Sequence, residues 1–133
     1  MDKIKNILEN AKTVAVVGLS PKPERASYGV AKYLQSRGYT IIPVNPVYEE
    51  VMDLKSYPSL LDIPGNIKID IVDVFRKPED TPPIAREAIK IKASCLWLQL
   101  GIASEESQKI ASDAGIDYIQ DKCMKIEYQR YFG

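Results

Sequence analysis

Short apolar runs alternate with amphipathic segments along the whole chain, and this alternation restricts the fold more than any other feature. The apolar runs are rich in valine and isoleucine and cover residues 13–18, 40–44, 69–75, 94–99 and 117–119. Runs of this length suit buried strands, and the segments of about ten residues or more between them suit crossover helices. We therefore predict an α/β, Rossmann-like three-layer fold with a five-stranded parallel sheet in the order 3-2-1-4-5.

Local signals agree with helices between the runs. Asp2 can cap a first helix, Gly38 suits the end of a second, and Ser104 and Gly115 suit the two ends of a later one. One residue conflicts with the predicted strand order, because Pro43 lies in a strand that this order makes internal, where proline is disfavoured. We expect Pro43 to lie near the carboxyl end of its strand, beyond the hydrogen-bonded ladder.

Length and charge narrow the class of protein. A chain of 133 residues is expected to form one domain, residues 1–133. Lys+Arg and Asp+Glu are both 18, which argues against broad electrostatic binding to nucleic acid or to an anionic membrane. The sequence has no run of about 20 apolar residues and begins with polar residues unlike a secretory signal, so we expect a cytoplasmic protein.

The chain contains no histidine. This absence removes the commonest general base and the usual Ser/His and Cys/His nucleophile pairs, and we expect a protein that is not an enzyme. The two cysteines, Cys95 and Cys123, have no metal-ligand spacing, so no metal site is expected. Trp97 and Cys95 lie within a strand and are expected in the core, whereas Cys123 is the better candidate for an exposed thiol.

In open parallel sheets, ligands bind outside the carboxyl ends of the strands. The residues that follow the predicted strands are Gly18, Leu19 and Ser20, then Asn45 and Pro46, then Phe75, Arg76 and Lys77, then Gly101, and finally Asp121. Ser20 and the start of the following helix offer hydrogen-bond donors to a phosphate, and Lys22 and Arg25 add cations. The competing interpretation of this loop is a turn with solvated charges.

A dinucleotide site is the obvious alternative ligand site. Ser20 and Pro23 stand where the second and third glycines of G-x-G-x-x-G are expected, and Asn45 stands where an acidic residue would bind a ribose hydroxyl. Lys22 and Arg25 could accommodate a 2′-phosphate, so NADP fits better than NAD. Asp70 and Asp73 lie three residues apart on one strand, which is not the spacing of a catalytic pair.

Six phrases in order resemble the small stand-alone CoA-binding proteins, which are related to the CoA-binding domain of the succinyl-CoA synthetase alpha subunit. They are 17–25, 38–46, 57–64, 72–76, 97–101 and 121–127. Three positions depart from the family pattern: no glycine occurs in 49–54, Lys92 stands where glycine is common, and Lys122 replaces an arginine.

The resemblance implies that the chain binds coenzyme A or an acyl-CoA without ligase chemistry, as a carrier or sensor. Carried over by position, it places Gly18, Leu19 and Ser20 near the pantetheine or phosphates, and Lys22 and Arg25 near the phosphates. Asn45 and Pro46 would border the nucleotide end, and Phe75, Arg76, Gln99 and Gly101 would line the cleft. Two alternatives remain: an NADP-dependent oxidoreductase, or a structural or partner-binding domain with a vestigial nucleotide site.

Overall fold

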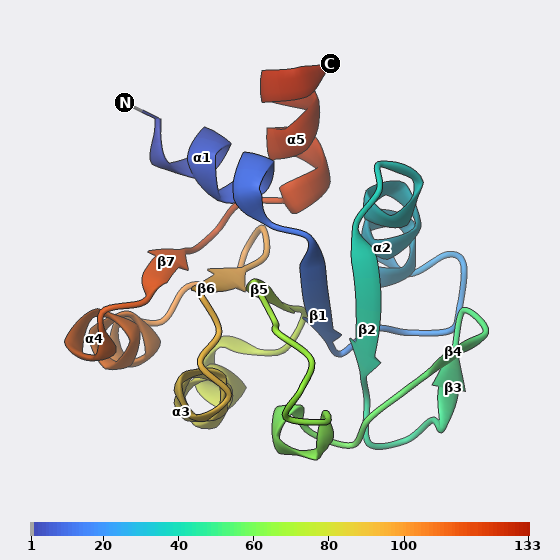
Figure 1. The fold of residues 1–133 in the computed structure, drawn as a ribbon, viewed down its shortest axis with the longest axis horizontal. Helices are drawn as coiled ribbons and strands as arrows, with labels where there is room; N and C mark the ends of the chain where they lie inside the picture. Colours follow the sequence, from blue (N-terminus) through green and yellow to red (C-terminus); the bar gives the residue numbers. More distant parts are fainter. Residues whose placement is uncertain (1) are drawn as a thin grey trace.

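A computed structural model describes residues 2–133 and contains a five-stranded, entirely parallel sheet (Figure 1). Its strands, in spatial order, are β2 (Thr40–Val44), β1 (Thr13–Val17), β5 (Ile71–Val74), β6 (Cys95–Leu98) and β7 (Asp117–Ile119). The helices are α1 (Lys3–Asn10), α2 (Ala26–Ser36), α3 (Thr81–Lys90), α4 (Glu105–Ala114) and α5 (Met124–Phe132). Two short 3₁₀ turns are η1 (Leu60–Asp62) and η2 (Pro78–Asp80), and β3 (Glu50–Val51) and β4 (Leu54–Lys55) form a small antiparallel hairpin.

The predicted α/β class and five parallel strands are confirmed, but the predicted strand order is wrong. Ile71–Val74, the third predicted strand, pairs with β1 and not with β2. The position beyond β2 is occupied by Tyr57, which forms a single parallel bridge with Val44. This one-residue bridge stands where the third strand of the predicted order would lie, and no periodicity over so few residues could have revealed it.

The strand order also explains Pro43, which lies inside the ladder opposite Val16 and not beyond it as we expected. The carbonyl of Pro43 faces away from β1 and accepts a hydrogen bond from the Tyr57 N–H at 3.0 Å. In a parallel strand the N–H and C=O of one residue point to the same side, so the proline nitrogen also faces outward. A missing N–H on that side breaks no bond to β1.

Helices cover both faces of the sheet. One face packs under α1, α2 and α5 and includes Val14, Val16, Ile71 and Trp97. The opposite face packs under η1, α3 and α4 and is lined mainly by alanine, valine and leucine side chains. Figure 1 shows α1 and α5 side by side on one side of the sheet and α3 and α4 together on the other. No helix in residues 2–133 is long and apolar enough to cross a membrane.

Three helices end in the same hydrogen-bonded motif. After each of α2, α3 and α4, a backbone N–H donates to the carbonyl five residues earlier, and the accepting carbonyls are those of Leu34, Ala88 and Ala111. The residue just before each donor has a positive φ. That residue is Gly38 (φ 99°), Lys92 (φ 60°) or Gly115 (φ 76°). The predicted helix ends at Gly38 and Gly115 are therefore confirmed, and Lys92 occupies a left-handed position that favours glycine.

The connection after β2 contains a hairpin that the sequence did not indicate. Met52 (φ 58°) and Asp53 (φ 60°) form its two-residue turn, with Val51 and Leu54 paired on either side. Turns of this type normally carry glycine or asparagine, and the segment 49–54 has neither. The turn therefore forms with Met52 and Asp53 in left-handed conformations, without the glycine or asparagine from which it could have been predicted.

Candidate functional site

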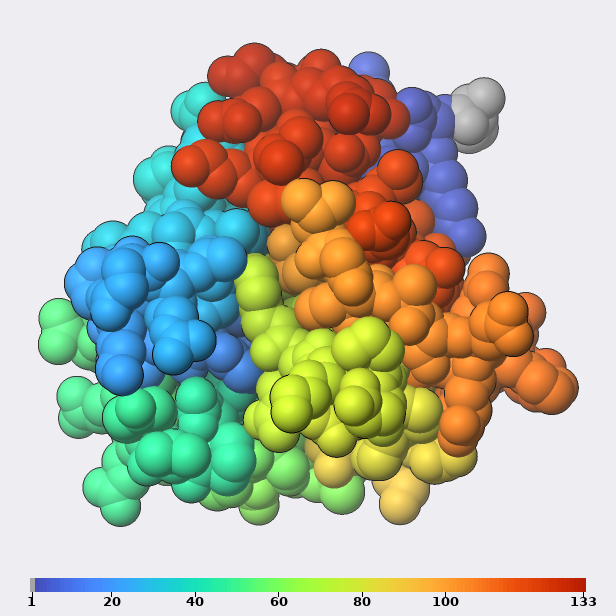
Figure 2. All heavy atoms as spheres, turned by 180° about the vertical axis from the view of Figure 1, so that it is seen from behind, coloured from blue at the N-terminus to red at the C-terminus, as the bar shows by residue number. Residues whose placement is uncertain are grey.

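Four predicted site residues form one row across the carboxyl ends of four strands. Extending the register by one position beyond Val44, Val17, Val74 and Leu98 places Asn45, Gly18, Phe75 and Gln99 side by side. By strand alternation these residues lie on the face covered by α1, α2 and α5. In Figure 2, the loop after β1 (blue), the segment after β5 (yellow-green) and the segment after β6 (orange) meet around the middle of one side of the molecule.

Gly18 allows the backbones of β1 and β5 to approach closely at this row. Its φ is +86°, and its N–H donates to the Val44 carbonyl at 2.8 Å. A Cβ at this position would lie 2.5 Å from the Phe75 carbonyl oxygen and 3.1 Å from Cδ of Arg76. Only glycine combines this φ with this lack of space, so the turn after β1 depends on it.

Asn45 fixes the loop after β1 in place. Its Nδ2 donates to the Leu19 carbonyl at 3.0 Å, and its Oδ1 accepts from the Val47 N–H at 2.9 Å. The side chain of Leu19 is fully buried in the core, so only its backbone can face a ligand. The asparagine that replaces an acidic ribose ligand therefore acts as a brace between the ends of β1 and β2.

The amino end of α2 lies directly after this loop. The Ser20 N–H donates to Oγ of Ser27 at 3.0 Å, and Oγ of Ser20 accepts from the Lys22 N–H at 3.1 Å. Arg25 is the N-cap of α2 and makes no side-chain capping bond. Lys22 and Arg25 are exposed, and within residues 2–133 neither forms an ion pair. Free cations beside a helix amino end form an environment suited to a phosphate.

Pro46 and Arg76 line a cavity of about 310 Å³ on the other side of the strand ends, between η1 and the start of α3. The same cavity is lined by three acidic residues, Glu79, Asp80 and Glu87. Glu87 is partly engaged, since its Oε1 accepts from the Leu60 N–H at 3.2 Å. The cavity is therefore mixed in charge, with one cation against three carboxylates, whereas the loop 22–25 carries two cations and one carboxylate, Glu24.

Gly101 and Asp121 close the far end of the strand edge. The Gly101 N–H donates to Oδ1 of Asp121 at 2.7 Å, and both residues have positive φ, 85° and 57°. Asp121 is exposed but engaged in holding this turn. Its role in the structure is to fasten the segment after β6 to the segment after β7.

Asp73 is the polar residue that sequence reasoning missed. It lies on β5 two residues before Phe75 and on the same face, is 0% exposed, and its Oδ1 accepts from Nε2 of Gln99 at 2.6 Å. Burial raises the pKa of the Asp73 carboxyl to about 7, although the hydrogen bond from Gln99 opposes the shift. The available signal was a carboxylate inside an apolar run, two residues before Phe75.

Three further residues that the sequence analysis singled out, Trp97, Cys95 and Cys123, lie away from the row. Trp97 and Cys95 are buried in the core as predicted, and the indole Nε1 of Trp97 donates to the Lys122 carbonyl at 2.8 Å. Burial raises the pKa of the Cys95 thiol, which keeps it protonated. Cys123, expected to be exposed, is a free thiol but only partly accessible, at the N-cap of α5.

Comparison with known proteins identifies the family. The CoA binding domain family matches residues 12–129. The chain belongs to this family. The predicted resemblance is therefore confirmed. The match spans the whole sheet and every residue of the row, and so includes the loop after β1, the amino end of α2 and the Asp73–Gln99 pair.

Two curated relatives and a solved structure show how the domain occurs elsewhere. The chain is 42% identical to YneT of Bacillus subtilis (strain 168) over 126 residues, which are 95% of this chain and 92% of YneT. It is 36% identical over 83 residues to the ADP-forming acetate–CoA ligase II of Archaeoglobus fulgidus, covering 59% of this chain but only 12% of the ligase. A hypothetical protein from Pyrococcus horikoshii OT3 superimposes with a TM-score of 0.94 and 45% identity, over 98% of this chain and 90% of that one.

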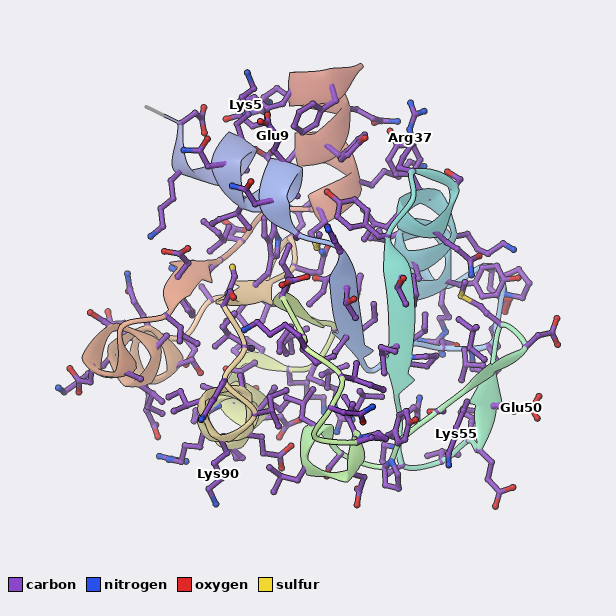
Figure 3. The ribbon with its side chains drawn as sticks, viewed as in Figure 1. Lys5, Glu9, Arg37, Glu50, Lys55 and Lys90 are labelled. Atoms are coloured by element: carbon purple, nitrogen blue, oxygen red, sulfur yellow. The ribbon has the colours of Figure 1, made fainter. Side chains whose placement is uncertain are left out.

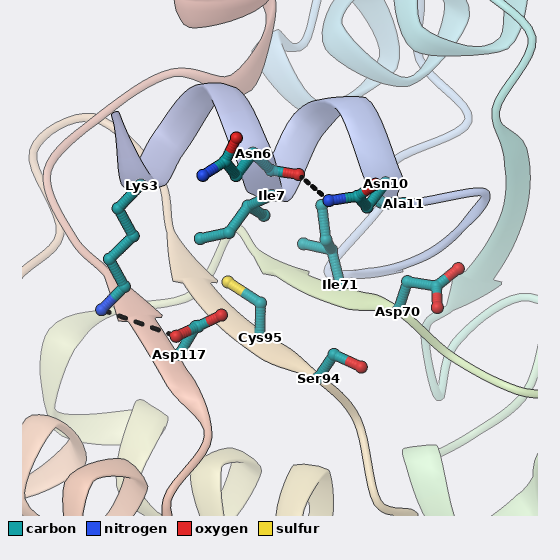
Figure 4. A pocket seen from close by; sticks show the side chains of 10 residues that line it. All are labelled: Lys3, Asn6, Ile7, Asn10, Ala11, Asp70, Ile71, Ser94, Cys95 and Asp117. Atoms are coloured by element: carbon teal, nitrogen blue, oxygen red, sulfur yellow. Dashed lines mark hydrogen bonds and ion pairs between the residues drawn. The ribbon is translucent and has the colours of Figure 1, made fainter. Parts of the chain in front are cut away.

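A second cavity lies at the opposite edge of the sheet. It has a volume of about 410 Å³ and is enclosed by α1 and the amino ends of β5, β6 and β7 (Figure 4). Figure 4 shows Ile7, Ile71 and Cys95 facing its interior, with Lys3 and Asp117 paired at 3.6 Å across its mouth. None of the predicted site residues lines it, so it is separate from the row at the carboxyl edge.

Proposed function

We propose that this chain, acting as one domain, binds coenzyme A or an acyl-CoA at the carboxyl edge of its sheet as a non-catalytic carrier or sensor. The observation that carries the proposal is the position of Lys22 and Arg25, free of ion pairs, at the amino end of α2 and beside the Gly18 turn. Membership in the CoA binding domain family supports the choice of ligand.

The phosphates of CoA are assigned to the loop after β1. Coenzyme A carries a pyrophosphate and a 3′-phosphate, and these need cations and N–H donors held at a fixed position. Lys22 and Arg25 supply the charges, and the unbonded N–H groups of the first turn of α2 supply the donors. We assign Arg76 a supporting charge, since its Cδ lies 3.1 Å from the position of a Cβ on Gly18, although the residue also lines the cavity of Glu79, Asp80 and Glu87.

The pantetheine arm is assigned to the row of Gly18, Phe75 and Gln99, with Gly101 beyond it. Phe75 is half-buried and offers an apolar wall, and Gln99 offers an amide to match the amides of the arm. Asn45 and Pro46 border the row at β2. A binding role is supported by the comparison with the Archaeoglobus ligase, where this chain corresponds to only 12% of the length of the enzyme.

Calorimetric titration of nucleotide-free protein with CoA, dephospho-CoA and NADP tests the proposal. We expect micromolar binding of CoA, weaker binding of dephospho-CoA, and a loss of about tenfold in CoA affinity in Arg25→Ala, equivalent to one charge-assisted hydrogen bond. Lys90→Ala is the matched control, because Lys90 projects from the distant end of α3 (Figure 3). Absence of CoA binding by folded protein, or tighter binding of NADP than of CoA, would overturn the proposal.

A further inference from the structure

Asp73 carries the one fully enclosed side-chain N or O atom in residues 2–133 that has no hydrogen-bond partner. Its Oδ2 has no hydrogen-bond partner, while Oδ1 is bonded to Gln99. An ionised carboxylate in such a place costs several kcal/mol, and a neutral acid costs much less. An unpartnered oxygen directly beneath the proposed ligand row requires a physical explanation.

Gln99 connects this buried acid to the ligand row. Its Nε2 is bonded to Asp73, and its Oε1 has no partner among the described residues. Among the described residues, Oδ2 of Asp73 is the one unpartnered side-chain N or O atom that is fully enclosed, so Oε1 of Gln99 is not fully enclosed. Gln99 is 3% exposed, so its amide bonds inward to the acid through Nε2 and keeps a small exposed area at Oε1.

We propose, as an extension of the proposed CoA site, that Asp73 is a positioning residue whose protonation sets the hydrogen-bonding polarity that Gln99 presents to the ligand. When Asp73 is ionised, its oxygen accepts from Nε2, and the acceptor Oε1 faces the cleft. When Asp73 is protonated, its O–H donates to Oε1 after the amide rotates by half a turn, and the donor Nε2 faces the cleft. One proton on Asp73 thus reverses the polarity of the cleft-facing atom.

The protonated form suits an anionic ligand. It removes a negative charge from the site of an anionic ligand and presents an N–H donor to the amide carbonyls of the pantetheine arm, and both changes favour CoA. By linkage, CoA binding then raises proton affinity at Asp73, and lower pH strengthens CoA binding by the same factor. The raised pKa of Asp73, about 7, places this exchange near neutrality.

The titratable residues of the hydrophobic cluster on this side of the sheet are Cys95 on β6, Tyr39 before β2, Tyr33 on α2, Cys123 before α5, and Tyr128 and Tyr131 on α5. Lys122 and Glu127 adjoin them, and Lys3, Lys5 and Glu9 of α1 are exposed. Burial raises the pKa of both Cys95 and Tyr39, so neither ionises near neutrality. Glu127 lies 3.7 Å from Arg130. Asp73 forms no ion pair with any of them.

The test is the pH dependence of dephospho-CoA affinity in wild type and Asp73→Asn. Dephospho-CoA is the probe because it lacks the 3′-phosphate, whose own ionisation near pH 6 would confuse the profile. We expect wild-type affinity to rise by about fivefold from pH 8 to pH 6. Asp73→Asn should bind with a flat profile at the affinity wild type has at pH 6. Asp113→Asn, an exposed carboxylate on α4, is the control and should keep the wild-type profile.

A ligand-free measurement keeps the inference testable if the variant does not fold. In ¹³C NMR, the Asp73 carboxyl of wild type should titrate near neutrality, and its midpoint should rise when dephospho-CoA is added. Micromolar binding with the same pH profile in wild type and Asp73→Asn, or a carboxyl midpoint below about pH 5, would overturn this inference and leave the CoA site standing. Loss of CoA binding in wild type at every pH would instead overturn the proposed function itself.

Discussion

An aspartate lies at each end of β5, and the two side chains differ in how completely they are hydrogen-bonded. At the amino end, Oδ2 of Asp70 accepts from the N–H groups of Lys12 and Thr13 at 2.8 and 3.0 Å. At the carboxyl end, Asp73 is fully buried with one partner and one unpartnered oxygen. The amino edge uses its carboxylate to fasten the chain, whereas the carboxyl edge holds an acid whose environment is incomplete without a ligand or a proton.

The largest effect that separates the two aspartates concerns stability at alkaline pH. The pKa of Asp73 is raised from 3.8 to about 7 in the folded protein, so between these values the native state binds more protons than the unfolded state. Stability contributed by this group is therefore present at low pH and lost as pH rises to about 7. Asp73→Asn should be more stable than wild type at pH 8 by about 4 kcal/mol, with little difference near pH 4.

Urea denaturation at several pH values measures this difference directly. Asp70→Asn serves as the comparison, because its side chain is bonded by two N–H groups and is not fully enclosed. A stability difference between wild type and Asp73→Asn that stays constant from pH 4 to pH 8 would show that Asp73 is charged throughout, and the contrast between the two ends would fail.

Gly18→Ala tests the close approach of backbones at the carboxyl edge. The added Cβ would lie 2.5 Å from the Phe75 carbonyl in a backbone with φ +86°, so we expect a loss of about 3 kcal/mol in unfolding free energy and loss of CoA binding. Gly65→Ala is the matched control, since a Cβ there meets nothing within 4 Å. Thermal melts and CoA titration of both variants measure the effect, and equal behaviour would contradict it.

Asp70→Ala tests the amino edge. Two backbone N–H groups lose their acceptor, so we expect destabilisation by about 2 kcal/mol. The affinity for CoA in the surviving folded protein should not change, because Asp70 lies at the edge of the sheet opposite the ligand row. Asp70→Asn retains an acceptor oxygen and should recover part of the stability. A change in CoA affinity in either variant would show that the two edges are not independent.

Lys92→Gly has the smallest expected effect, and it also tests whether the amino edge of the sheet is independent of the ligand row at the carboxyl edge. Lys92 follows α3 on the way to the amino end of β6 with φ 60°, so glycine should stabilise the protein by about 1 kcal/mol. The bond from Nζ of Lys68 to the Lys92 carbonyl involves only backbone at position 92 and is retained. Chemical denaturation should show the gain, with unchanged CoA affinity; destabilisation would mean that the Lys92 side chain makes a contribution the backbone does not reveal.

The sequence by itself determined which segments become the five parallel strands and the helices between them, because hydrophobic periodicity and end signals are local. Residues such as Asp2, Ser104 and Gly115 cap helices where predicted, and Trp97 is buried where predicted. The rule that ligands bind at the carboxyl ends of parallel strands also brought Gly18, Asn45 and Phe75 together, since it needs only the direction of the strands and not their order. Gln99 was added by the family resemblance.

The tertiary structure decided the order of the strands and the meaning of Asp73. A single bridge at Tyr57 occupies the place beside β2, and hydrophobic periodicity, which extends over several residues, cannot predict a bridge of one residue. Asp73 acquires its raised pKa and its bond to Gln99 only when β5 is enclosed between β1 and β6. Burial and pairing depend on residues distant along the chain, and for that reason a carboxylate in an apolar run could be noticed but not interpreted.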